Sequence, residues 1–228
     1  MDVQRAVALL QTYGGRDKAL RTIYYALVLL AGRLDARSKL AAKLLAAAKQ
    51  FSTARMVARR LNDLPMLLAA SRALATPQHS VQDHISHRLQ TAVTLLYTVF
   101  HPIEHIAWLA DLQLINVQPT RWFQACVAIW AMALVCTIAK ALRDYLQCVS
   151  KRIELRDDDE DSLKRVSRDE HEHLYTIVMS TCDLMNAVNS LPRGVLWSQT
   201  LPQWKVGAYG VLASAMGLCR LYRDTAAK

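Results

Sequence analysis

Apolar residues recur along the chain at helical spacing, and prolines separate the apolar runs. There is no Asn-Gly or Asp-Gly hairpin turn and no sustained alternation of polar and apolar residues. The six prolines mark helix starts or stops. The pattern therefore predicts an all-α fold, with helices at about 17–31, 34–62, 80–100, 103–116, 120–148, 164–190 and 203–223.

Two of these helices are apolar enough to suggest an integral membrane protein. Trp122 to Ala139 carries no charge over 18 residues, and this covers ~27 Å of a bilayer core that is ~30 Å thick. The second run, Val206 to Cys219, has 14 uncharged residues, and Lys205 could lengthen it by snorkelling. We predict two transmembrane helices, the alternative for each being a buried helix of a soluble bundle.

The second apolar run also carries small residues at a spacing of four. Small residues at this spacing let membrane helices approach closely. We therefore predict a helix-packing face, which could support self-association, at Gly210, Ala213, Ser214 and Gly217.

A basic amphipathic stretch occupies residues 34–62. Its apolar residues recur at alternating spacings of four and three, and no acidic residue lies between Asp35 and Asp63. A cationic face beside an apolar stripe is typical of a helix in a membrane interface; the alternative is a bundle helix with a solvated basic face. The residues predicted to bind anionic lipid are Lys39, Leu40, Lys43, Leu44, Lys49, Phe51, Arg55, Ala58 and Arg59.

Charge supports an anionic partner. The net charge is +9, and residues 1–60 hold all of the excess, with 12 Lys or Arg against three Asp. Such an excess favours nucleic acid or acidic lipid headgroups. No helix-turn-helix, zinc-finger pattern or aromatic platform accompanies it, so we expect lipid and no nucleic acid.

Catalytic motifs are not evident, and we predict neither enzymatic activity nor a cofactor. The pattern His101-Pro102-Ile103-Glu104-His105 matches H-x-x-E-H, the inverted zinc-protease pattern, and a zinc enzyme is the alternative that it leaves. Capping of a helix that starts at Pro102 is the simpler interpretation. The five cysteines are widely spaced, and we expect free thiols. Ser167 follows Lys164 and Arg165, which makes it a possible phosphorylation site.

The segment 156–173 is almost wholly charged or polar, and we predict a solvated linker there. The chain then divides into a basic amphipathic region (1–118), a first hydrophobic helix (119–148), a charged linker (149–173) and a C-terminal helical hairpin with the second hydrophobic helix (174–228).

Three blocks of the sequence resemble the peroxin-11 family of peroxisomal membrane proteins, most closely its gamma (C) type. They are Tyr13–Tyr25 (YGGRDKALRTIYY), Phe100–Trp130 and Asn186–Gly207, and the last two are rich in Trp and Pro. The resemblance implies an integral protein of the peroxisomal membrane that promotes elongation, proliferation and fission. It also implies curvature by an inserted amphipathic helix at about 34–62, self-association, and cooperation with a fission adaptor and a dynamin-like GTPase.

Two other classes use the same sequence features. A channel for small metabolites would need the same apolar helices. A soluble helical adaptor would bury them in its core.

Overall fold

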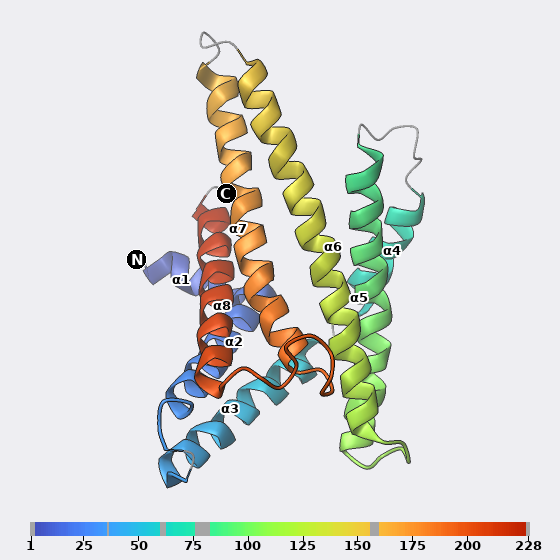
Figure 1. The fold of residues 1–228 in the computed structure, drawn as a ribbon, viewed down its shortest axis with the longest axis vertical. Coiled ribbons are helices and arrows are strands. Elements are labelled where there is room, and N and C mark those ends of the chain that lie inside the picture. The colour runs from blue at the N-terminus through green and yellow to red at the C-terminus, as the bar shows by residue number, and fades with distance from the viewer. Residues whose placement is uncertain (1–2, 36, 60–62, 76–82, 156–159, 227–228) are drawn as a thin grey trace. The chain divides into compact units, whose positions relative to one another are not determined.

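The computed structural model describes residues 3–35, 37–59, 63–75, 83–155 and 160–226, and in these ranges it is helical with short turns and no strand. The all-α prediction is confirmed. The chain forms two compact units (Figure 1). Unit 1 joins Met1–Leu61 to Val188–Lys228, and unit 2 is Asn62–Ala187.

Unit 1 is built around helix α2 (Tyr13–Ala31), which packs against α1 (Val3–Gln11), α3 (Lys39–Ala58) and α8 (Gln203–Ala226). The Thr12 hydroxyl caps α2 by accepting a hydrogen bond from the Gly15 amide at 3.0 Å. Ser38 caps α3 in the same way, which is why α3 begins later than the predicted residue 34.

Helices α2 and α8 run antiparallel and side by side (Figure 1). The end of α2 meets the start of α8, since Gly32 lies against Trp204. At the other end, Gly14 at the start of α2 lies against Leu221. Segments from the two ends of the sequence therefore form one helical pair.

Unit 2 contains α4 (Asp63–Ala75), α5 (His84–Asp111), α6 (Pro119–Glu154) and most of α7 (Glu160–Asn189). The unit ends at Ala187, two residues before the end of α7. Helices α5 and α6 form an antiparallel hairpin, and α4 packs on α5. Helices α6 and α7 form a second hairpin (Figure 1). Its core contains Ala131, Leu134 and Ala187.

Pro102 lies inside α5, so the predicted helix break at this residue is wrong. A proline inside a helix removes one backbone hydrogen bond. Here the flanking residues Phe100, His101 and Glu104 are buried, and packing of this stretch offsets the lost bond.

The predicted linker is also helical where the structure describes it, because α7 begins at Glu160. Charged residues stabilise this part of α7. Lys164 pairs with Glu160 at 2.8 Å along the helix, and Glu170 pairs with Arg152 of α6 at 2.9 Å. Residues 156–159 lie outside the described ranges. The four-part division of the chain stays a prediction.

Within the described residues, α6 is the one helix long and apolar enough to cross a membrane. Only 28% of its most apolar window is buried in the protein, and most of the other residues of this window are half-buried. The second predicted span lies in α8. This segment is helical, but its uncharged run is shorter than that of α6, so its crossing of a membrane stays a prediction. The α2 helix beside it carries Arg16, Asp17, Lys18 and Arg21.

Candidate membrane-binding surfaces

Helix α3 places its predicted lipid-binding residues on two different sides. The side that packs on α2 is centred on Ala41 and Ala48, which are 4% and 1% exposed. Leu44, Phe51 and Ala58 are half-buried, whereas Leu40 is 55% exposed. Helix α2 therefore covers part of the predicted apolar stripe.

The cations of α3 also divide. Lys39, Lys43 and Lys49 are exposed. Arg55 points toward α2, where its Nε donates to Asp17 Oδ1 at 2.9 Å. Burial alone would raise the pKa of Asp17, but the charge of Arg55, its hydrogen bond and the charge of Arg59 hold that pKa below its usual value. The lysines are available to a lipid surface, and Arg55 instead joins α3 to α2.

The sequence interpretation missed α4, whose apolar face is turned outward. Leu64, Leu67, Leu68 and Leu74 are 78%, 56%, 50% and 66% exposed. Ala70 is the buried residue of this helix, at 7% exposed. The helical spacing of the leucines was visible in the sequence, but Pro65 suggested a break. It lies in the first turn of α4, where proline is tolerated.

The predicted helix-packing face of α8 lies against α2 of the same chain. Ala213 and Ser214 are fully buried, and the Ser214 hydroxyl donates to the Gly210 carbonyl at 2.6 Å. A Cβ atom on Gly210 would lie 2.0 Å from the Tyr25 ring. A Cβ atom on Gly217 would lie 3.2 Å from the Lys18 side chain. Close approach at these positions therefore joins the two ends of the chain.

Charged residues fix the hairpin of α5 and α6 just beyond the apolar run. Asp83 caps α5 through the Ile85 and Ser86 amides and accepts from Arg143 Nε of α6 at 2.8 Å. The hydrogen bond from Arg143 holds the pKa of Asp83 well below its usual range. Beside it, Asp144 pairs with Lys140 at 2.6 Å and accepts from the Ser86 hydroxyl.

The histidine pattern of α5 lies beside a small cavity in unit 2. His101, Pro102 and His105 line it together with Thr98, Met66 and Leu67, and its volume is about 220 Å³. No cluster of three or more potential metal ligands occurs among the described residues. Ser167 lies within α7 with its carbonyl 2.6 Å from His171 Nδ1, and its phosphorylation stays a prediction.

Comparison with known proteins gives the same family along nearly the whole chain. Residues 3–222 match the family described as Peroxisomal biogenesis factor 11 (PEX11). The mouse protein named Peroxisomal membrane protein 11C is 30% identical over 231 residues, which cover 97% of this chain and 95% of the mouse protein. The human protein of that name is 29% identical over 223 residues, which cover 94% and 92%. No solved structure matches.

Proposed function

Because this chain belongs to the Peroxisomal biogenesis factor 11 family, we propose that it elongates the peroxisomal membrane before fission by inserting an amphipathic surface into one leaflet. It is a peroxisomal membrane protein of peroxisome biogenesis. The family is one of biogenesis factors rather than of enzymes. The proposal concerns how the membrane is deformed.

The outward leucine face of α4 carries this proposal. Helices on a protein surface normally turn their apolar residues inward. Helix α4 does the opposite, with four leucines at least half exposed. Full burial of a leucine side chain is worth ~1.5–3 kcal/mol, so transfer of the exposed parts into lipid would contribute ~4–7 kcal/mol in all. A bilayer interface supplies the apolar environment that this face lacks in water.

The exposed lysines of α3 supply an electrostatic contribution. Lys39, Lys43 and Lys49 face solvent, and each cation near an anionic leaflet is worth ~1 kcal/mol. Three together would raise the affinity for anionic membranes ~10²-fold. Insertion of the α4 leucine face adds area to one leaflet, and this bends the membrane.

We further propose the partners that this function needs. They are anionic lipids, other copies of this chain or of its family, a fission adaptor and a dynamin-like GTPase. Family membership supports these partners.

The first test replaces Leu64, Leu67, Leu68 and Leu74 by serine in the full chain. The variant should reach peroxisomes but should no longer elongate them when overexpressed. A matched control replaces exposed apolar residues of the α5–α6 loop, Leu112, Leu114 and Ile115, by serine, and it should elongate peroxisomes normally. Elongation by the α4 variant at the level of the unmodified chain would refute insertion by α4.

The second test changes Lys39, Lys43 and Lys49 to glutamate. We expect elongation to weaken while the fold is unchanged, because all three side chains are exposed. Circular dichroism of the purified variant checks the fold. Undiminished elongation would show that the charge of α3 does not act on the membrane.

A further inference from the structure

One side of α6 is covered by neither α5 nor α7, and it carries a continuous apolar seam. Its members alternate at spacings of three and four, which is a heptad repeat. Leu142, Leu146 and Ile153 are 48%, 56% and 78% exposed, and Val149 is half-buried. The α6 seam consists of Met132, Val135, Ala139, Leu142, Leu146, Val149 and Ile153.

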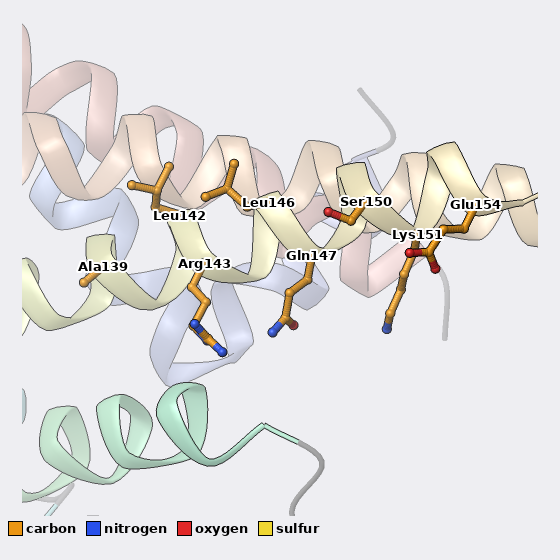
Figure 2. A pocket seen from close by; sticks show the side chains of 8 residues that line it. All are labelled: Ala139, Leu142, Arg143, Leu146, Gln147, Ser150, Lys151 and Glu154. Carbon is orange, nitrogen blue, oxygen red and sulfur yellow. The ribbon is translucent and has the colours of Figure 1, made fainter.

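Charged residues of α6 lie beside the seam and not on it. The seam runs for 22 residues, or ~32 Å. Arg143 turns to Asp83 of α5, and Arg152 turns to Glu170 of α7. Seam residues and their neighbours line an open groove of about 560 Å³ on α6. In Figure 2, Leu142 and Leu146 lie on one edge of it, and Arg143, Gln147 and Lys151 are directed to the other.

Lipid can account for only the first part of this seam. The uncharged run of α6 ends at Ala139, and Lys140, Arg143 and Asp144 follow within five residues. Three charged residues so close together are unfavourable in hydrocarbon, so this part of α6 lies beyond the hydrocarbon core. Leu142, Leu146 and Ile153 therefore lie outside the region that acyl chains cover. Neither α5 nor α7, the hairpin partners of α6, covers these three side chains, which stay 48%, 56% and 78% exposed.

We propose that the α6 seam binds the same seam of a second copy of this chain. This rests on the proposed function, which needs association between copies, and it names the surface. The predicted packing face at Gly210 is occupied by α2, so it is not the surface that meets another copy. The uncharged seam is complementary to itself, as an interface between identical copies related by a twofold axis must be.

Heptad spacing supports a protein partner in particular. A straight helix has 3.6 residues per turn, so a strict heptad drifts by ~20° per repeat unless a second helix winds around it. Two α6 helices crossing one membrane in the same orientation run parallel. In a parallel pair, the residues that flank the seam on one helix face flanking residues five positions later on the other. Ile138 would then face Arg143 of the other copy and Tyr145 would face Ser150, so these pairs contain no like charges.

Disulfide cross-linking of the full chain in peroxisomal membranes tests this proposal. The accessible native thiols Cys136, Cys148 and Cys219 are first replaced by serine. In this background, Leu146→Cys should give a disulfide-linked dimer under mild oxidation, because equivalent seam positions face each other in a parallel pair. The matched control is Lys151→Cys, which is exposed on the same helix but off the seam, and it should stay monomeric.

A triple variant, with Leu142, Leu146 and Ile153 changed to lysine, provides the second measurement. Co-purification of two differently tagged copies should fall at least ~10-fold, while circular dichroism stays unchanged because the three side chains are exposed. Undiminished co-purification, or equal cross-linking at residues 146 and 151, overturns the proposal. Neither assay depends on α4, so loss of elongation in the α4 variant with intact cross-linking would separate the two proposals.

Discussion

Gly207 offers the sharpest test of the α2–α8 pair. A Cβ atom at this position would lie 2.4 Å from the Leu29 Cα and N atoms, whereas non-bonded carbons pack at ~3.5–4.0 Å. Backbone atoms cannot rotate away, so Gly207→Ala must push the helices apart. Overpacking of this kind costs ~1–3 kcal/mol, and the backbone contact puts it at the upper end. The better helix propensity of alanine returns ~1 kcal/mol, which leaves a net loss of ~2 kcal/mol.

The matched control is Gly217→Ala, farther along the same helix. Its nearest neighbours are Lys18 Cδ and Cε at 3.2 Å, and this flexible side chain can move. Alanine should therefore keep its propensity gain and stabilise the protein by up to ~1 kcal/mol. Thermal unfolding of the full chain in detergent, followed by tryptophan fluorescence, measures both, since Trp204 of α8 lies against Gly32 at the end of α2 in the same helix pair. Equal stabilisation by the two substitutions would refute close packing of α2 and α8 at Gly207.

Two further predictions concern the charged contacts. Arg55→Ala should lower the free energy of unfolding by ~2 kcal/mol, because Asp17 is left without its half-buried partner. The control Lys49→Ala should change this free energy little. Equal effects of the two substitutions in chemical denaturation would exclude a stabilising Arg55–Asp17 ion pair between α3 and α2. For Asp83, the folded pKa lies below the ordinary value, so its ionised carboxylate stabilises the fold fully above about pH 5 and loses this effect as the pH falls toward the folded pKa. The difference in Tm between the unmodified chain and Asp83→Asn should therefore shrink between about pH 6 and about pH 3, and a constant difference would contradict the role of its charge.

The helical fold class could be predicted from the spacing of apolar residues along the chain. The apolar helix α6 could be predicted from the 18 uncharged residues Trp122–Ala139, since a run of this length forms a helix in a membrane or in a protein core. Proline positions were less informative. Pro65 lies in the first turn of α4 and so agrees with a helix start, whereas Pro102 lies inside α5 and not at a helix end. Local rules about proline describe an isolated helix, and the buried packing around Pro102 overrides them in α5.

The candidate surfaces show the same limit. The sequence places Arg55 beside an apolar stripe, but only the fold brings Asp17, 38 residues away, to within hydrogen-bonding distance. Likewise, the small residues near Gly210 were recognised as a close-packing face, while their partner Tyr25 could not be. Periodicity gives the face of a helix that will be buried, and long-range contacts decide what covers it.

The composition of unit 1 has a consequence for biosynthesis. Helix α2 and its antiparallel partner α8 are separated by about 170 residues of sequence, and the whole of unit 2 lies between them. Contacts at such separation form late, since a long loop must first be closed. The ribosome releases α2 and α3 long before α8 exists, so the basic helix emerges without the support of its completed unit. Unit 2, with the apolar helix α6, is synthesised in the interval. The α2–α8 contact that completes unit 1 therefore forms only after unit 2 has been synthesised.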